Sequence, residues 1–144
     1  MSISSIIHAL LYVHPPHTLV VHFPIALVSV ALFFLLLALF WKADLMEKIA
    51  FANMCLAALS TLVAMVLGMR DNLVFYHGMA AHHVTKIALA VTLFVVTTAT
   101  VIVRWRNPKV FFGWGKYYYL AAYVVSFGIV AVLGFLGGVI IFGT

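Results

Sequence analysis

Two pairs of histidines stand at the starts of two apolar segments of the sequence. His17 and His22 are five residues apart, and so are His77 and His82. An imidazole ring in apolar surroundings costs free energy unless it is hydrogen-bonded or bound. Neutral imidazole is also a strong axial ligand of haem iron and the commonest metal ligand among side chains. The two pairs therefore predict a bound cofactor, and we expect that cofactor to be haem.

The composition indicates which solvent surrounds these histidines. The chain has 144 residues, of which 67% are hydrophobic and only 8% are charged, whereas a soluble domain carries roughly one-quarter charged residues. Lipid must therefore cover most of the surface. The formal charge of +5 comes from basic residues beside the apolar segments, which is typical of membrane topology signals. We therefore expect no nucleic-acid partner.

Four apolar segments are each near the roughly 20 residues that a helix needs to cross the hydrocarbon of a bilayer. They cover about 18–41, 49–69, 82–103 and 117–142. They lack the alternation of barrel strands, and open sheets cannot span a bilayer. The sequence therefore predicts an all-α integral membrane four-helix bundle, a single transmembrane domain over 1–144. A short interfacial helix is expected at residues 1–12.

The basic residues predict how the bundle is oriented. Most of them flank the first and third connections, and few lie at the other ends of the spans. The first group is Lys42, Lys48, Arg104, Arg106, Lys109 and Lys116, and the second is Arg70 and Lys86. We therefore expect these two connections in the cytoplasm, and both termini and all seven histidines outside. An aromatic belt is expected at the cytoplasmic interface from Trp41, Trp105, Trp114, Tyr117, Tyr118 and Tyr119.

The leading ligand pair is His22 with His82, because both lie near the outer ends of spans that run in the same direction. His17 and His77 form a second pair nearer the water. Successive helical residues point about 100° apart, so His83 is expected beside the ligand and not on the iron. We expect one or two b-type haems, since the sequence has no C-x-x-C-H motif for covalent attachment.

Glycines gather in the same outer half of the predicted bundle. A glycine lets a backbone approach a flat ring closely. The candidates for cofactor binding on this ground are Gly68, Gly78, Gly134 and Gly138. Gly134 and Gly138 also form the small-xxx-small pattern of tight helix packing, and that explanation stays open.

Two other functions remain open from the residues alone. The four paired histidines could bind Cu, Zn or Fe directly, or the chain could be a cofactor-free structural or accessory subunit of a membrane complex. His8 and His14 are expected to bond water at the interface, and Cys55, the only cysteine, to be a small buried hydrophobe. No nucleophile–base constellation, phosphate loop or pair of carboxylates indicates catalysis by the chain itself.

The residues around the first histidine pair resemble a known family. The run His17-x4-His22-Phe23-Pro24-Ile25-Ala26-Leu27 is similar to the HP-x-x-VHFPIAL opening of small bacterial membrane proteins catalogued as domain of unknown function 2231. Similar to the same pattern are Gly68-x2-Asp71, His77, His82 and Gly134-x2-Gly137-Gly138, so the likeness spans nearly the whole chain. Thr18 departs from it, since the family commonly has proline there. The resemblance implies a four-span, multi-pass protein of the bacterial inner membrane and implies no activity. In such a membrane the orientation predicted from the basic residues would place the histidine cluster on the periplasmic side.

The residues therefore predict a membrane electron-transfer subunit with a cytochrome b-like, bis-histidine haem. We expect it to pass electrons between membrane quinol and a periplasmic or membrane-bound carrier. A chain without a soluble domain is expected to be a subunit of a larger redox complex in the lipid bilayer. The analogy with four-helix membrane cytochromes b is one of fold only.

Overall fold

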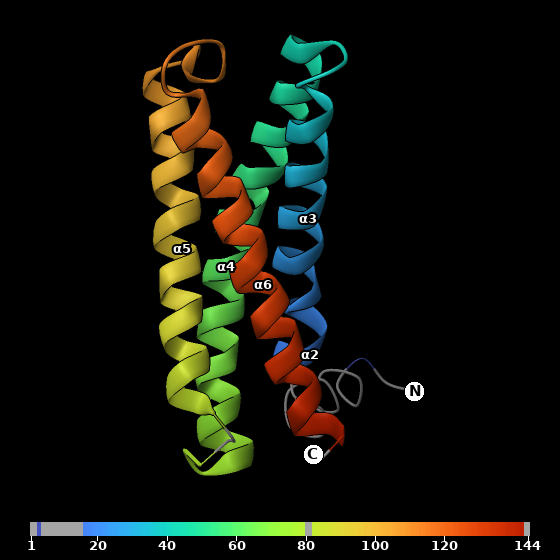
Figure 1. Cartoon of the computed structure of the whole chain (residues 1–144). Coiled ribbons are helices and arrows are strands. Elements are labelled where there is room, and N and C mark those ends of the chain that lie inside the picture. Colours follow the sequence, from blue (N-terminus) through green and yellow to red (C-terminus); the bar gives the residue numbers. More distant parts are fainter. Residues whose placement is uncertain (1–2, 4–15, 80–81, 143–144) are drawn as a thin grey trace.

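The computed structural model describes residues 3, 16–79 and 82–142 of the chain (Figure 1). In order, its elements are α2 Pro16–Val20, α3 His22–Leu37, α4 Ala43–Tyr76, α5 His83–Arg106, the 3₁₀ turn η2 Val110–Phe112 and α6 Lys116–Phe142. Every one of these described elements is helical, as the sequence predicts. The interfacial helix expected at residues 1–12 lies outside the described residues, apart from Ile3.

Four helical segments are long and apolar enough to cross a membrane, which confirms the predicted four-span, all-α class. They are Pro16–Leu37, Ala43–Tyr76, His83–Arg106 and Lys116–Gly138. The second segment extends well past the predicted end at residue 69, through Arg70 and Asp71. These two side chains form an ion pair, and Asp71 also binds the main chain of α2. Partners inside the protein therefore let the helix continue where hydropathy suggested a boundary.

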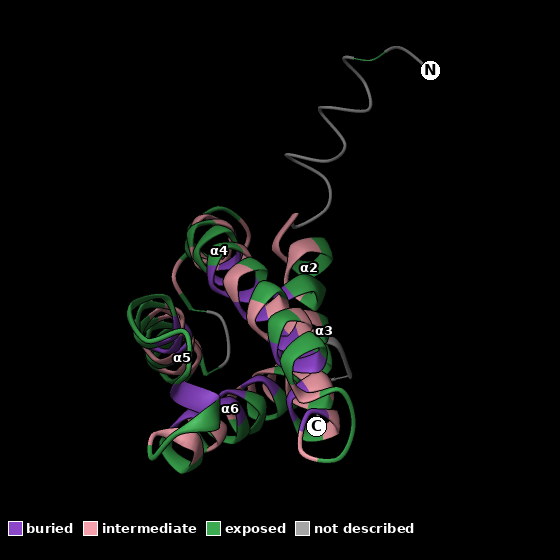
Figure 2. Ribbon diagram, turned by 90° about the horizontal axis from the view of Figure 1, so that it is seen from above, coloured by how far each residue is buried: buried purple, intermediate pink, exposed green. Residues whose placement is uncertain are grey.

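The four long helices stand around a common centre when seen along the bundle (Figure 2). α3 packs against α4 and α6, and α5 packs against the same two helices, so α3 and α5 lie across the diagonal. α2 begins and α6 ends at one end of the bundle, where α4 also ends and α5 begins (Figure 1). We call this the histidine end, after His17, His22, His77, His82 and His83, and the opposite one the basic end. Which side of the membrane each end faces stays a prediction.

Each helix meets its neighbours through one inward stripe that follows the 3.6-residue period of an α-helix. α4 contributes small residues to this core, among them Ala50, Ala57 and Ala64, and α3 contributes Ala31. Small side chains let helix backbones approach closely, and such packing drives helix association in lipid, where apolar burial between helices gains little. Figure 2 shows the buried residues on the sides of the helices that face one another.

Most buried hydroxyl groups in the spans are satisfied within their own helices. The exception among the described residues is Oγ1 of Thr98, which is buried and has no hydrogen-bond partner. Thr61, Thr97, Thr100 and Ser126 each donate to the carbonyl oxygen four residues earlier, at 2.7 to 2.8 Å. A hydroxyl paired in this way adds no unsatisfied polar group to the hydrocarbon. These side chains therefore need no polar partner from a neighbouring helix.

The first span is interrupted next to its histidines. Val21 forms a turn between α2 and α3, and its N–H donates to the carbonyl oxygen of His17 at 2.9 Å. Pro24 follows in the first turn of α3. Proline costs little there, because the N–H groups of a first turn have no partner within their helix. The backbone of the first span is therefore irregular just before His22.

A buried polar cluster joins three helices at the basic end. Glu47 of α4 is fully buried, and Arg104 of α5 donates to both of its carboxylate oxygens, through Nε and, at 2.8 Å, through Nη2. Tyr119 of α6 donates to the same carboxylate at 3.2 Å, and its hydroxyl lies 2.8 Å from that of Tyr123. A buried ion pair is tolerated when further hydrogen bonds satisfy its remaining polar atoms. The two tyrosines provide this help.

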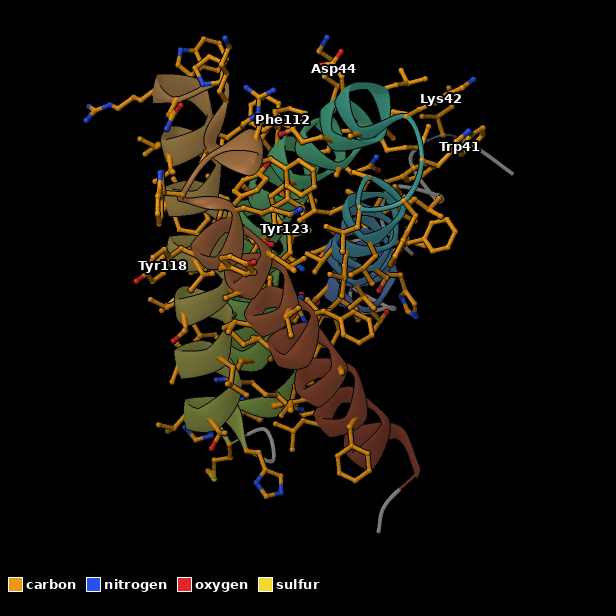
Figure 3. The ribbon with its side chains drawn as sticks, turned by 45° about the horizontal axis from the view of Figure 1, so that its top comes forward. Trp41, Lys42, Asp44, Phe112, Tyr118 and Tyr123 are labelled. Carbon is orange, nitrogen blue, oxygen red and sulfur yellow. The ribbon has the colours of Figure 1, made fainter. Side chains whose placement is uncertain are left out.

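The position of Tyr119 corrects the aromatic belt expected from the sequence. The other five members, Trp41, Trp105, Trp114, Tyr117 and Tyr118, are exposed, but Tyr119 is only 3% exposed. Tyr119, Tyr123 and Ser126 recur at the spacing of one helix face, which in α6 is the face toward the core. Figure 3 shows Tyr123 directed into the bundle and Tyr118 directed away from it.

The cluster predicts that two of the ion pairs of α4, Glu47 with Arg104 and Asp44 with Lys48, differ strongly in their contribution to stability. Arg104→Met leaves the carboxylate of Glu47 buried without its cation, so we expect a loss of about 3–5 kcal/mol in the free energy of unfolding. Lys48→Met removes the exposed pair with Asp44 and should cost at most about 0.5 kcal/mol. Unfolding in mixed detergent micelles, followed by circular dichroism, measures both. Equal losses for the two variants would show that the buried pair adds nothing particular.

Candidate histidine site

The imidazole of His17 lies on the continuation of the inward stripe of α3. Pro24, Val28 and Ala31 are buried residues of that stripe, and His17 precedes Pro24 by two helical turns. The ring packs against α4, where its Nδ1 is 2.9 Å from the carbonyl oxygen of Ala64. A carbonyl oxygen only accepts, so Nδ1 carries the proton and, in the neutral ring, Nε2 keeps its lone pair. The structure thus holds His17 in the tautomer that can ligate through Nε2.

Gly68 provides the space in which this ring lies. A Cβ atom added to Gly68 would be 3.0 Å from both Cε1 and Nδ1 of His17, which is closer than ordinary van der Waals contact. Gly68 and Ala64 are one helical turn apart on α4, so one position accepts the hydrogen bond while the other leaves room for the ring. The sequence singled out Gly68 as a position of close approach, and the group that approaches it in the structure is an imidazole.

Asp71 fixes the main chain of the same histidine. Its carboxylate is almost fully buried, Oδ2 accepts the backbone N–H of His17 at 2.9 Å, and Oδ1 accepts a hydrogen bond from Arg70 at 2.9 Å. The first N–H groups of a helix have no partner within it, and a carboxylate there also interacts favourably with the helix dipole. Asp71 therefore caps α2 from a different helix. Gly68 and Asp71, three residues apart in α4, act on one histidine.

α5 presents two more polar side chains toward this region. Leu93 and Thr97 are buried inward positions of α5, and Lys86 precedes Leu93 by two turns. Lys86 is close enough to the ring of His17 for their charges to interact. His83, the first residue of α5, is half-buried. The inner side of the histidine end therefore brings together groups from α2, α4 and α5.

His22 lies outside this group. It precedes Pro24 by two residues, which is about 200° around a helix, and its ring is exposed. Its Nδ1 is 2.8 Å from the carbonyl oxygen of Thr18, so Nε2 keeps its lone pair here too. The expected pairing of His22 with His82 stays a prediction, and a cofactor on His22 would lie against the outer side of α3.

The second histidine pair does not repeat the backbone of the first. His77 ends α4 with a φ of 49°, and His82 precedes α5 with a φ of 54°. Both are exposed residues in the left-handed region, which histidine adopts more often than most residues other than glycine. Gly78, with a φ of 79°, completes the turn after His77. The five-residue spacing therefore reflects a loop at His77 and His82, whereas at His17 and His22 it is nearly continuous helix.

The remaining glycine candidates differ in their surroundings. A Cβ atom added to Gly134 would lie 3.7 Å from Cδ1 of Ile25, an ordinary contact that marks where α6 packs against α3. Nothing described lies within 4 Å of such an atom at Gly78 or Gly138. Packing thus accounts for Gly134, and a role of Gly78 or Gly138 beside a cofactor stays a prediction.

A metal site made only of protein side chains is not assembled in the described part of the chain. No three His, Cys, Asp or Glu residues among residues 16–79 and 82–142 lie close enough together to hold a metal ion. Direct Cu, Zn or Fe binding by the four paired histidines would need such a cluster. A haem needs only two axial ligands from the protein, because the porphyrin supplies the rest.

The structure separates His17 from His22 by direction around the helix. The sequence analysis separated them by depth in the membrane, because hydropathy reports depth and not direction. A usable signal was present: His17, Pro24 and Ala31 recur every seven residues, which is the repeat of an inward face. Ala64 carries no such signal, since its contribution is a main-chain oxygen.

The fold defines a polytopic helical membrane protein of four spans, with a half-buried imidazole near one end of the bundle. The chain belongs to the family described as "Predicted membrane protein (DUF2231)", whose model matches residues 13–143. This confirms the family resemblance drawn from the VHFPIAL-type opening. No match was found among curated proteins or solved structures.

The contact between Gly68 and His17 can be tested by comparing alanine substitutions at Gly68 and at a glycine with open space around it. Gly68→Ala should push the ring from the Ala64 carbonyl and cost about 1–3 kcal/mol of unfolding free energy, the usual result of overpacking. Gly128→Ala is the matched control, because nothing lies within 4 Å of a Cβ there. The better helix propensity of alanine should leave that variant unchanged or up to about 1 kcal/mol more stable.

A double variant isolates the imidazole as the cause. In a His17→Ala background the Cβ at Gly68 meets no ring, so Gly68→Ala should lose most of its cost. Unfolding in mixed micelles provides all four free energies of the cycle. If Gly68→Ala is as harmless as Gly128→Ala in the parent chain, the close packing described here is wrong.

Proposed function

We propose that this protein is a membrane electron-transfer subunit that binds one b-type haem at the histidine end of the bundle. His17 is one axial ligand in this proposal, and a histidine at the start of α5, His82 or His83, is the other. The observation that carries the proposal is the hydrogen bond from Nδ1 of His17 to the carbonyl oxygen of Ala64. Ligating histidines almost always donate their other ring N–H to a carbonyl, carboxylate or water, which fixes ring orientation and tautomer.

The surroundings of His17 Nε2 fit a ligand role. In the described part of the chain this nitrogen makes no hydrogen bond, and the residue is half-buried. A polar atom at this depth in a membrane protein is costly unless something binds it. Coordination to iron would satisfy it without any change in the contacts of the ring with Ala64 and Gly68.

The helix arrangement supports ligands from two sides. α3 and α5 lie across the diagonal of the bundle, and α2 continues the line of α3 (Figure 1). A ligand from α2 and one from the start of α5 would therefore approach an iron from opposite sides. Lys86 on the inner side of α5 could pair with a haem propionate, because a carboxylate near lipid needs a cation.

The proposed role is to move one electron at a time between a reduced carrier in the membrane, such as quinol, and a partner at the histidine end. Bis-histidine ligation leaves no open coordination position on the iron, so it favours electron transfer over chemistry on a bound substrate. The orientation predicted from the basic residues places this end in the periplasm of a bacterial inner membrane. A partner complex or periplasmic carrier would then receive the electron there.

A spectrum of the purified protein tests this function. We expect a Soret band, split α and β bands on reduction, and about one haem per chain by pyridine haemochrome. His17→Ala should lose the haem, because the histidine at the start of α5 would then have no second axial ligand opposite it. His22→Ala is the matched control and should keep it, because its ring is exposed on the other side of the helix.

The same variants separate the competing ligand sets. His82→Ala and His83→Ala identify the second ligand by loss of the low-spin spectrum. If His22→Ala loses the haem and His17→Ala keeps it, the ligands are the exposed pair and our choice of His17 is wrong. A folded, colourless protein from haem-supplemented cells would overturn the function itself. It would favour an accessory subunit in which His17 only packs against α4.

A further inference from the structure

A lipid-facing groove lies between α5 and α6 toward the basic end. Its volume is about 480 Å³, and its walls are almost wholly apolar. Val95, Ala99 and Val103 line it from α5, Tyr118 and Ala122 from α6, and Val110 closes it at the connection between the two helices. Along α5 the groove extends about 12 Å from Val103 to Val95, at 1.5 Å per residue. Its long, narrow, apolar form suits a hydrocarbon chain.

Positive charge surrounds the connection that closes this groove. Arg106 is the last residue of α5, and Lys109 lies in the connection. Lys116 directly follows the groove residue Gly115. Nζ of Lys116 is 5.2 Å from the ring centroid of the buried Phe111, a cation–π contact that fixes this ammonium group near the end of the groove.

No acidic side chain balances these cations. All three acids of the chain, Asp44, Glu47 and Asp71, lie in α4, and Glu47 is already paired with Arg104. The half of the protein formed by α5, the connection and α6 therefore carries only positive charge. An occupant that complements it has an apolar chain and an anionic head.

We propose that the groove between α5 and α6 binds an anionic phospholipid. One acyl chain lies along Val95, Ala99 and Ala122, and the phosphate is held by Lys116, with Arg106 and Lys109 around it. Trp114 and Tyr118, both strongly exposed, flank the headgroup as interfacial aromatic residues do. The orientation expected from the sequence places this site in the cytoplasmic leaflet, where anionic lipids are common. Because the groove includes Tyr119, the bound chain also supports the Glu47 cluster.

The test compares phosphatidylglycerol with phosphatidylcholine of the same acyl chains, added to the detergent-purified full chain. Bound lipid is counted by native mass spectrometry, and stability is measured as the Tm. We expect one retained phosphatidylglycerol per chain and a Tm rise of about 5 °C or more at saturating lipid. Phosphatidylcholine should raise the Tm by less than half as much.

Two variants with matched controls separate the head from the chain. Lys116→Gln should lose the preference for phosphatidylglycerol, whereas Lys48→Gln, which changes an exposed lysine of α4, should keep it. Ala122→Phe fills the groove and should abolish lipid retention. Ala121→Phe, on the exposed side of the same helix and outside the groove, should not.

Three results would overturn the proposal. Equal Tm shifts with the two lipids would mean that the headgroup is not recognised. Equal lipid retention in Ala122→Phe and Ala121→Phe would mean that the groove is not the site. Loss in Ala122→Phe with an unchanged preference for phosphatidylglycerol in Lys116→Gln would mean that Lys116 does not hold the phosphate. None of these readouts depends on haem, so the outcome is independent of the electron-transfer proposal.

Discussion

Every polar group that enters lipid must find its partner inside the protein, and this constraint organises the structure described here. Backbone groups are satisfied by helix formation, and mid-span hydroxyls, with the exception of Thr98, by carbonyls of their own helices. The side chains that cannot be satisfied locally are paired between helices at the two ends of the bundle. At the basic end Arg104 and Tyr119 donate hydrogen bonds to Glu47. At the histidine end the backbone N–H of His17 donates to Asp71 from another helix, and Arg70 donates to it from the same helix.

The two ends differ in what these pairings leave available. In the Glu47 cluster the carboxylate oxygens, the guanidinium and the hydroxyls all have partners, so the cluster fastens α4, α5 and α6 together. At the histidine end the main chain and Nδ1 of His17 are held, but Nε2 has no hydrogen bond among the described residues. A side chain held rigidly with one ligating atom left over is the arrangement expected of a binding site. This asymmetry is why the functional proposal rests on His17.

The sequence predicts the helices of this fold well and the direction of their side chains poorly. Long apolar runs identify four spans without knowledge of any neighbour, because the bilayer sets their length. The inward face of each span depends on the other helices, so Tyr119 was wrongly expected at the interface. For the same reason the sequence did not separate the inward ring of His17 from the exposed ring of His22. The charges of Arg70 and Asp71 led the sequence analysis to end the second span at residue 69. In the structure α4 continues, because these side chains bond to each other and to α2 and do not need water. His77 and His82 have left-handed backbone conformations in a loop, and the hydrophobic pattern of the sequence does not predict the conformation of a loop.

The distance between two acidic residues of the long helix α4 indicates the membrane thickness that suits this protein. Glu47 and Asp71 both point inward and are separated by about 36 Å along the helix at 1.5 Å per residue. The hydrocarbon core of a typical bilayer is about 30 Å thick. A moderate tilt of α4 therefore brings both carboxylates to the level of the lipid headgroups at once. In a much thinner bilayer one polar cluster would leave that level, so the protein is matched to membranes of ordinary thickness.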